Sequence, residues 1–195
     1  DEIPPRYAGV ILEIPMQEIQ HTIIGEIAIQ ERVQSLGKQI SDHYTSTDPL
    51  ILIGILKGAL FFLADLSRAL TIPVEIELMS ISSYRAGTES SGVVRILTDL
   101  AREINDRHIL VVEDIIDTGL TMSVLLGNLE ARNPASLKVC TLLDKASRRN
   151  VHVPIAYCGF EIADEFVVGY GLDFNQRFRN LPYIGTLNPT FINSR

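Results

Sequence analysis

The chain has 195 residues, of which 46% are hydrophobic and 21% are charged. This balance excludes an intrinsically disordered chain and is typical of one globular domain with its own core. The formal net charge is -7, which argues against a general nucleic-acid binder, because such proteins place an excess of Lys and Arg against the phosphate backbone.

The first half of the chain predicts alternating helices and strands. Residues 27–44 carry apolar side chains at helical spacing and predict an amphipathic helix on the core. Residues 50–56 (LILIGIL) are continuously apolar and predict a strand buried on both faces, followed by a largely buried helix over 57–70. Residues 73–84 and 92–100 predict two strands, joined by a mobile loop of small and polar residues, RAGTESSG.

The second half of the chain continues this pattern. Residues 108–113 and 137–144 predict buried strands, with a helix between them over about 119–132. Strand-like stretches at 153–160 and 166–170 precede a polar tail. Because apolar strands alternate with helices, we expect one α/β domain, with a parallel twisted sheet flanked by helices and ligands at the carboxyl edge of its strands.

Cysteine usage and hydropathy bear on the compartment. The two cysteines, Cys140 and Cys158, lie in apolar surroundings, which predicts buried thiols in a reducing cytoplasm. No apolar run reaches the roughly 18 residues that span a bilayer, and GVILEI near the start is too short for a signal peptide. We therefore expect a cytoplasmic protein without a membrane partner.

Residues 117–121 (DTGLT) join the end of a predicted strand to the start of a helix. Unpaired backbone N–H groups and the helix dipole attract anions at such a turn, and Gly119 permits close approach of a phosphate monoester. It is not a Walker loop, because the chain has no GxxxxGK[ST] motif. A helix start without a ligand would use the same residues, since Asp117 and Thr118 are both good N-caps.

Glu113 and Asp114 stand at the end of the preceding strand, where their charges would repel a nearby phosphate. A divalent cation, or a ligand that carries hydroxyls or positive charge beside its phosphate, would resolve this conflict. Mg²⁺ typically binds one or two carboxylates together with substrate phosphates. The alternative is that one of the two side chains is an ordinary surface charge.

The stretch VVEDIIDTGLTM (111–122) resembles the phosphoribosyl pyrophosphate signature of the type I phosphoribosyltransferases. The segments GILKGALFF, SSYRAGT, CTLLDKASRR, DEFVVGYGLD and RFRNLPYIG resemble, in this order, the hypoxanthine (hypoxanthine-guanine) phosphoribosyltransferases, closest to the short bacterial type. The resemblance covers about residues 10–187. It implies a small hood subdomain from about 1–26 and 153–195, and a flexible hairpin lid at about 82–92.

The resemblance implies a Mg²⁺-dependent enzyme of purine salvage. It would transfer the 5-phosphoribosyl group of phosphoribosyl pyrophosphate to hypoxanthine, and also to guanine, giving IMP or GMP and pyrophosphate. A preference for xanthine or guanine is an alternative, because discrimination at the 2-position of the base rests on backbone contacts and water near Val167 to Asp173. The family forms dimers and tetramers, so a homodimer or homotetramer is expected.

The resemblance also assigns roles to the signature turn. The turn would cradle the 5′-phosphate, while Glu113 and Asp114 would hold the ribose hydroxyls directly or through Mg²⁺. Asp117 would be the catalytic base that handles the N7 proton of the purine. Leu120 stands where some relatives carry a charged or polar residue. The residues assigned to the phosphoribosyl group are Glu113, Asp114, Asp117, Thr118, Gly119, Leu120 and Thr121.

The implied pyrophosphate site comes from three segments. The family holds the peptide between Leu56 and Lys57 in the cis form. Lys57 could also be an ordinary exposed lysine, although a cation at a helix start opposes the helix dipole. Ser83 and Tyr84 would close over the site and exclude water. The residues assigned to pyrophosphate are Leu56, Lys57, Gly58, Ser83, Tyr84 and Arg179.

For the implied purine site, Lys145 would donate to the 6-oxo group, which adenine lacks, and Phe166 would stack on the base. Core packing would also explain Phe166 and Val167. Arg149 matches a basic residue near pyrophosphate and a subunit contact, but its pairing with Arg148 is equally typical of a solvated face. The purine-site residues are Ile115, Lys145, Phe166, Val167 and Asp173, and the metal ligands are Glu113, Asp114 and Asp173, the last of them through water.

Two other classes of protein share parts of this pattern. A metabolite-sensing regulator of the same fold would bind RNA or DNA, which the acidic charge and the intact set of acids disfavour. A receiver-type phosphoacceptor places its acidic pair and its acceptor aspartate on different strands. Here Glu113, Asp114 and Asp117 share one turn.

Overall fold

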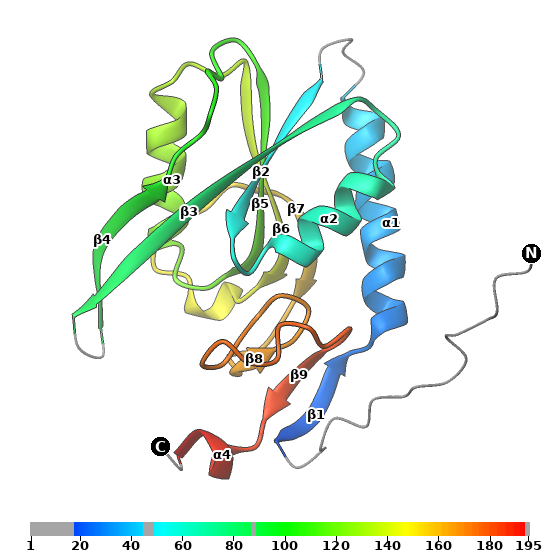
Figure 1. Ribbon diagram of the computed structural model, residues 1–195, viewed down its shortest axis with the longest axis vertical. Helices are drawn as coiled ribbons and strands as arrows, with labels where there is room; N and C mark the ends of the chain where they lie inside the picture. Colours follow the sequence, from blue (N-terminus) through cyan, green and yellow to red (C-terminus); the bar gives the residue numbers. More distant parts are fainter. Residues whose placement is uncertain (1–17, 45–48, 87–88, 194–195) are drawn as a thin grey trace, which may run out of the picture.

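The computed structural model describes residues 18–44, 49–86 and 89–193. A six-stranded sheet has the strand order β4-β3-β2-β5-β6-β7, and a three-stranded sheet below it in Figure 1 has the order β1-β9-β8. The strands are β1 (Ile19–Ile24), β2 (Leu50–Leu56), β3 (Val74–Ala86), β4 (Glu89–Thr98), β5 (His108–Ile116), β6 (Ser136–Asp144), β7 (Ile155–Glu161), β8 (Val167–Val168) and β9 (Ile184–Leu187). The helices are α1 (Glu26–His43), α2 (Leu60–Ala69), α3 (Leu120–Glu130), the 3-10 helix η1 (Ala146–Arg148) and α4 (Pro189–Asn193).

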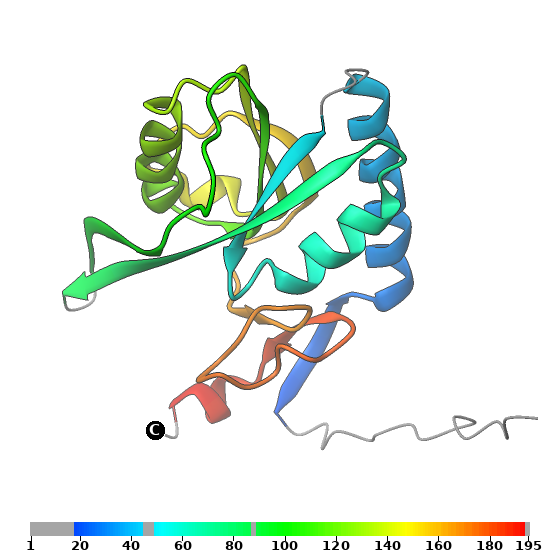
Figure 2. The same cartoon turned by 45° about the horizontal axis from the view of Figure 1, so that its top comes forward.

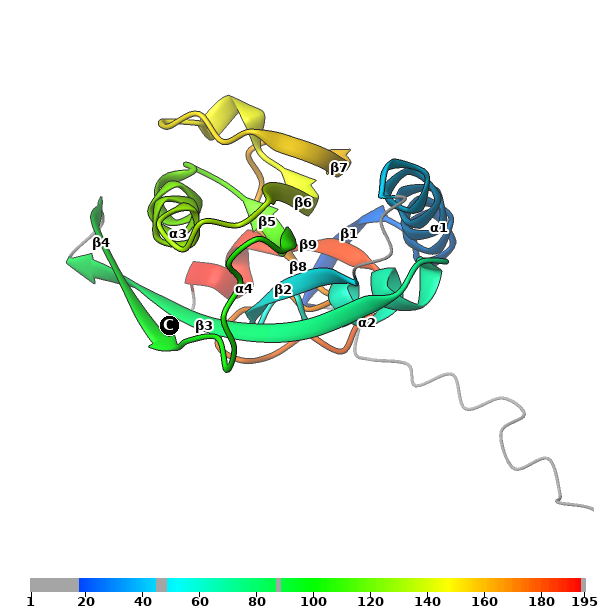
Figure 3. The ribbon, with the colours of Figure 1, turned by 90° about the horizontal axis from the view of Figure 1, so that it is seen from above.

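The larger sheet confirms the expected parallel α/β architecture. Strand β2 pairs in parallel with β3 and β5, and β6 and β7 continue the parallel sheet beyond β5. Among the described strands of this sheet, β4 alone is antiparallel to its neighbour, β3. Figure 3 shows α1 and α2 on one face of the sheet and α3 on the other. The chain therefore changes faces between β2 and β5, and ligands of open α/β sheets bind at the carboxyl ends of strands at such a point.

Strand β2 is buried on both faces, as its continuous apolar run predicts. Successive side chains of a strand point to opposite faces, and here Leu52 packs in the core cluster that contains Leu63 of α2. Ile53 packs in the cluster that contains Leu125 of α3. Because this strand is anchored by two cores, the loop that follows Leu56 starts from a fixed position.

The hairpin of β3 and β4 projects away from the body of the sheet (Figure 2). Residues 85–92 were expected to form an eight-residue loop, but Arg85 pairs with Ser90 and Ala86 pairs with Glu89. Most of the segment is therefore strand, and residues 87–88 lie outside the described part of the chain. Backbone pairing extends the hairpin here, although the side chains are small and polar.

The three-stranded sheet brings distant parts of the chain together. Strand β9 pairs with β1 on one side and with β8 on the other, antiparallel in both cases. Strand β1 was not predicted from the sequence. Strand β7, which falls in the expected hood segment 153–195, lies at the edge of the six-stranded sheet. In the described part of the chain, the smaller sheet consists of β1, β8 and β9.

Tyr170 ties the loop after β8 to helix α2. It is buried, and its hydroxyl donates a 2.6 Å hydrogen bond to Oδ2 of Asp65. Burial raises the pKa of Tyr170, and the Asp65 carboxylate raises it further, so the phenol remains a neutral donor. This bond fixes the loop around Gly171, which reaches the proposed pyrophosphate site.

We expect Tyr170→Phe to lower the free energy of unfolding by about 1 kcal/mol, because the replacement removes one partly buried hydrogen bond. Urea unfolding measures this change. The double variant Tyr170→Phe/Asp65→Ala should lose less free energy of unfolding than the sum of the two single variants, since both substitutions break the same hydrogen bond. Additive losses would contradict a shared hydrogen bond.

Candidate active site

Backbone hydrogen bonds join the turn between β5 and α3 to the segment that follows β6. The carbonyl of Thr118 accepts hydrogen bonds from the amides of Asn150 (2.9 Å) and Val151 (3.1 Å). Gly119, the N-cap of α3, is left-handed with φ 85°, and a Cβ there would lie only 2.5 Å from the Val151 carbonyl. The first amides of α3 have no acceptor within the helix, so this turn presents them at the carboxyl edge of the sheet, where an anion can bind.

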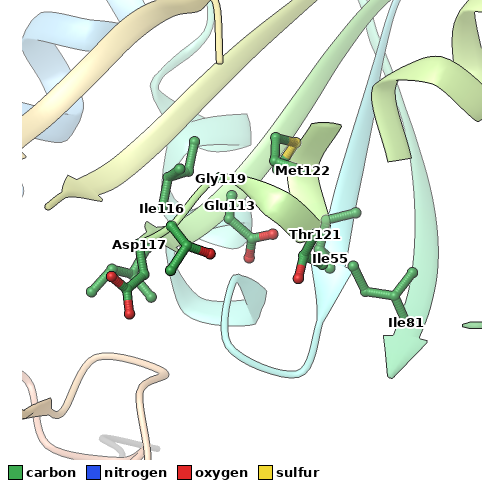
Figure 4. Close-up of a pocket in the computed structure, with 10 residues that line it drawn as sticks. Ile55, Ile81, Glu113, Ile116, Asp117, Gly119, Thr121 and Met122 are labelled. Carbon is green, nitrogen blue, oxygen red and sulfur yellow. The ribbon is translucent and has the colours of Figure 1, made fainter. Parts of the chain in front are cut away.

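A pocket of about 240 Å³ opens over this turn. Figure 4 shows the carboxylates of Glu113 and Asp117 in it, together with the hydroxyl of Thr121. The pocket therefore combines acidic groups, a helix start and an apolar wall. Its lining residues are Ile55, Ile81, Glu113, Ile115, Ile116, Asp117, Thr118, Gly119, Thr121 and Met122.

Glu113 and Asp114 are adjacent, half-buried acids at the end of β5. Burial raises the pKa of Glu113 well above its usual range, and the charge of Asp114 raises it further. Burial also raises the pKa of Asp114. Two carboxylates in this position repel each other, and a cation or hydroxyl donors would relieve the repulsion.

The carboxylate pair fits Mg²⁺, which commonly takes one or two protein carboxylates and completes its shell with substrate phosphates and water. Among the described residues, no group of three or more His, Cys, Asp or Glu side chains is placed to hold a metal ion. The remaining ligands would therefore come from the substrate and from water. Asp173 lies on the loop after β8, where its carboxylate accepts a hydrogen bond from the Gln176 amide and pairs with Arg179.

The loop after β2 reaches the same place from the neighbouring strand. Its Leu56–Lys57 peptide bond is cis, as the family resemblance implies. Lys57 is exposed, and its Nζ lies 3.4 Å from Oε1 of Gln176. A Cβ at Gly58 would overlap the Asp114 carboxylate, and a Cβ at Gly171 would overlap the Gly58 carbonyl. The loop after β2, the end of β5 and the loop after β8 therefore meet at Gly58. They approach so closely that positions 58 and 171 have space for glycine alone.

Arg179 completes this meeting point from the loop after β8. Its Nη1 donates a 2.6 Å hydrogen bond to the Gly171 carbonyl, and its Nη2 lies 2.5 Å from Oδ1 of Asp173. Its buried Nε has no hydrogen-bond partner among the described residues. Its charge opposes the rise in the pKa of Asp114. A mostly buried guanidinium with an unused donor is suited to an anionic ligand.

The residues assigned to the purine lie around the end of β6. Lys145 is buried, its amide donates to the Ile116 carbonyl over 3.0 Å, and its Nζ lies 3.7 Å from Oδ1 of Asp164. Phe166 is 49% exposed and meets Phe174 edge to face, so core packing does not account for it. Val167, in contrast, is buried in the core.

The structure brings six of the predicted site residues into one pocket: Glu113, Ile115, Asp117, Thr118, Gly119 and Thr121. Asp114, Leu56, Lys57, Gly58 and Arg179 belong to the adjacent meeting point around Gly58. Leu120 begins α3. The backbones of Ser83 and Tyr84 lie in β3, but their side chains are outside the described part of the structure.

The pair Arg148 and Arg149 was expected to be either a basic group near the site or a solvated face, and the structure shows Arg148 exposed and Arg149 half-buried. Arg149 is 16% exposed, pairs with Asp144 and donates a 2.7 Å hydrogen bond to the Asp117 carbonyl. Arg148 lies 3.0 Å from the Asp117 carboxylate. The only signal in the sequence was the position of both arginines just after Lys145, at the end of a predicted strand.

Comparison with known proteins identifies the family of the chain. The family model described as a phosphoribosyl transferase domain matches residues 24–175. The chain belongs to the phosphoribosyltransferase family. It is 51% identical over 177 residues to the hypoxanthine-guanine phosphoribosyltransferase of Mycobacterium avium, covering 88% of this chain and 87% of that protein. It is 50% identical over 165 residues to the hypoxanthine phosphoribosyltransferase of Haemophilus influenzae, covering 84% and 92%.

A solved structure of a hypoxanthine phosphoribosyltransferase from Staphylococcus aureus superimposes on this phosphoribosyltransferase with a TM-score of 0.90. The two chains are 40% identical, and the match covers 95% of this chain and all of the other. The fold and the family are thus the same. None of the helices in the described residues has the length and apolar character that a membrane span requires.

Proposed function

We propose that this phosphoribosyltransferase transfers the 5-phosphoribosyl group of phosphoribosyl pyrophosphate to N9 of hypoxanthine and of guanine, releasing pyrophosphate. One observation carries the proposal. At the point where the chain changes faces of the sheet, a helix start suited to phosphate lies beside the carboxylates of Glu113 and Asp117 in a single pocket. A ligand with a phosphate, a ribose and a reacting carbon matches that sequence of groups. The relative from Mycobacterium avium is named for hypoxanthine and guanine, and the relative from Haemophilus influenzae for hypoxanthine.

In this proposal the substrate lies along the turn. The amides of residues 118–121 and the hydroxyl of Thr121 bind the 5′-phosphate. Glu113 and Asp114 accept hydrogen bonds from the ribose hydroxyls and hold Mg²⁺, which when bound supplies charge neutralisation for the pyrophosphate leaving group. The loop amides at Leu56, Lys57 and Gly58 and the guanidinium of Arg179 bind pyrophosphate, and Ser83 and Tyr84 close over it.

The base would lie between the turn and the end of β6. Asp117 accepts the N7 proton as N9 attacks the ribose carbon, and the carboxylate also stabilises the positive charge that develops on the reacting groups. Lys145 donates to the 6-oxo group and Phe166 stacks on the purine ring. The segments around Ile115 and Val167 lie along the edges of the purine. Asp173 would assist a second Mg²⁺ through water.

Initial rates with hypoxanthine, guanine, xanthine and adenine, each with Mg²⁺ and then with excess chelator, test this function. We expect nucleotide formation with hypoxanthine and guanine, little with adenine, and loss of turnover with the chelator. Faster use of xanthine than of hypoxanthine would favour the xanthine- and guanine-preferring alternative. Turnover of adenine as fast as of hypoxanthine would contradict the role of Lys145, and a band shift with RNA or DNA but no turnover would favour a regulator.

We expect Lys145→Ala to raise the KM for hypoxanthine by roughly 10-fold to 100-fold, because a buried donor to the 6-oxo group is lost. The KM for phosphoribosyl pyrophosphate should change little. Lys138→Ala is a suitable control, since Lys138 also lies on β6 but contacts His43. Unchanged hypoxanthine kinetics in Lys145→Ala would show that another group reads the 6-position.

We also propose that the protein works as a homodimer or homotetramer in the cytoplasm. Large apolar side chains remain exposed on α2 (Leu60, Phe61) and on β3 (Ile76, Leu78), which supports association through this side of the molecule. Light scattering after size-exclusion chromatography measures the mass in solution. A monomer at all concentrations would contradict the proposal.

A further inference from the structure

A single guanidinium joins two aspartates at the edge of the proposed purine site. The Nε of Arg148 lies 3.0 Å from Oδ1 of Asp117. Its Nη1 lies 3.2 Å and 3.3 Å from the two carboxylate oxygens of Asp164. Asp117 comes from the turn after β5, and Asp164 from the loop between β7 and β8. The arginine therefore links two segments that are 47 residues apart in the chain.

The two neighbouring arginines hold different parts of Asp117. Arg149 donates to its backbone carbonyl over 2.7 Å, whereas Arg148 contacts its carboxylate. Oδ1 of Asp117 is buried and has no hydrogen-bond partner among the described residues, so its contact with Arg148 is an ion pair, while 42% of the side chain remains exposed. The exposed surface of the side chain therefore belongs to atoms other than Oδ1.

We propose that Arg148 is a positioning residue for phosphoribosyl transfer, an inference that rests on the proposed function of Asp117. Through the ion pair with Oδ1, the charge of the guanidinium holds the carboxylate so that Oδ2 faces the N7 proton of the base. A base held by a third group is a common arrangement in catalysis, because orientation of the carboxylate strongly affects the rate. Arg148 itself does not touch the reacting atoms.

The same guanidinium also affects the lysine that reads the base. Oδ1 of Asp164 lies 3.2 Å from Nη1 of Arg148 and 3.7 Å from Nζ of Lys145. Without Arg148, Lys145 is the cation that remains beside this carboxylate among the described residues, so the two would pair more closely. A lysine engaged in this way is a poorer donor to the 6-oxo group. Arg148 thus keeps Asp164 from occupying Lys145.

Steady-state kinetics of Arg148→Gln test the inference. We expect kcat to fall roughly 10-fold to 100-fold, as for a misplaced catalytic group, and the KM for hypoxanthine to rise, while the KM for phosphoribosyl pyrophosphate stays within about twofold. Arg148→Lys should restore part of kcat, because it keeps one cation near Asp117. Adding Asp164→Asn to Arg148→Gln should return the KM for hypoxanthine toward the wild-type value but leave kcat low, since only the competition for Lys145 is removed.

Arg132→Gln is the matched control, because Arg132 also pairs with an aspartate, Asp99, over 2.9 Å, but lies just beyond the other end of α3. It should leave all three constants near wild type. The inference is overturned if Arg148→Gln has wild-type kcat, or if it raises both KM values together with a fall in the melting temperature, which indicates a merely structural role. If the wild-type protein makes no nucleotide from any purine, the proposed function fails and the inference with it; if only Arg148→Gln lacks an effect, the proposed function stands.

Discussion

Asp117→Asn is expected to lower turnover with hypoxanthine by roughly 10²-fold to 10⁴-fold, the range typical of a lost general base. The amide has nearly the same size as the carboxylate, so the turn between β5 and α3 should keep its geometry. It cannot accept the N7 proton, however, and it loses the charge that faces Arg148 at 3.0 Å. Binding of phosphoribosyl pyrophosphate should be largely kept, because the backbone amides of the turn remain.

Single-turnover formation of IMP measures the chemical step, and isothermal titration calorimetry measures the affinity for phosphoribosyl pyrophosphate. Asp42→Asn is the matched control, since Asp42 is an exposed aspartate on α1 that pairs with Lys38 over 2.6 Å. It should leave both quantities unchanged. Turnover of Asp117→Asn within about threefold of wild type would exclude Asp117 as the base, since loss of a general base costs far more.

The main sheet could be predicted from the sequence because its strands are buried on both faces. The continuous apolar run 50–56 predicted a strand with the observed bounds Leu50–Leu56, and residues 137–144 match β6 within one residue. Helix α1 was found through apolar residues at helical spacing, and Ile29 and Val33 are indeed in its buried face. The local pattern of apolar residues was sufficient to predict an element wherever that element is buried in the core.

Strand β1 could not be predicted because the local sequence does not encode its partner. Its residues IQHTII are mostly exposed, and its neighbour β9 (Ile184–Leu187) is distant in the chain. Strand β8 (Val167–Val168), in contrast, lies within the strand-like stretch predicted at 166–170. Both strands exist because the smaller sheet forms between segments that come together only in the folded chain.

The site shows the same division between local and distant information. The turn 117–121 was recognised from its order of acids, threonines and glycine, and it lines the pocket. The groups that hold it in place were missed, because Arg149 contacts Asp117 across 32 positions of sequence. A pair of arginines on a polar segment is usually solvent-exposed, and only tertiary contacts distinguish this pair from an ordinary surface charge.

The close approach at Gly58 leads to the second large effect. Gly58→Ala places a methyl group where the Asp114 carboxylate lies, and the Gly58 carbonyl is already in close contact with Gly171. The loop is thus confined on two sides, so the carboxylate that would hold ribose and Mg²⁺ has to move. We expect kcat/KM for phosphoribosyl pyrophosphate to fall about 10²-fold, the cost of displacing a site group by roughly 1 Å.

Gly127→Ala separates this effect from a general sensitivity of the fold to added methyl groups. Gly127 lies inside α3, and a Cβ there would meet nothing within 4 Å. Alanine should therefore raise the free energy of unfolding by about 0.5–1 kcal/mol, since glycine is unfavourable inside a helix, with no change in kinetics. Wild-type kinetics in Gly58→Ala would mean that the Asp114 carboxylate can move away from the added methyl group without loss of activity. A loss of activity in Gly58→Ala with a melting temperature close to wild type would locate the damage at the carboxylate, because a carboxylate can rotate without unfolding the two cores that anchor β2.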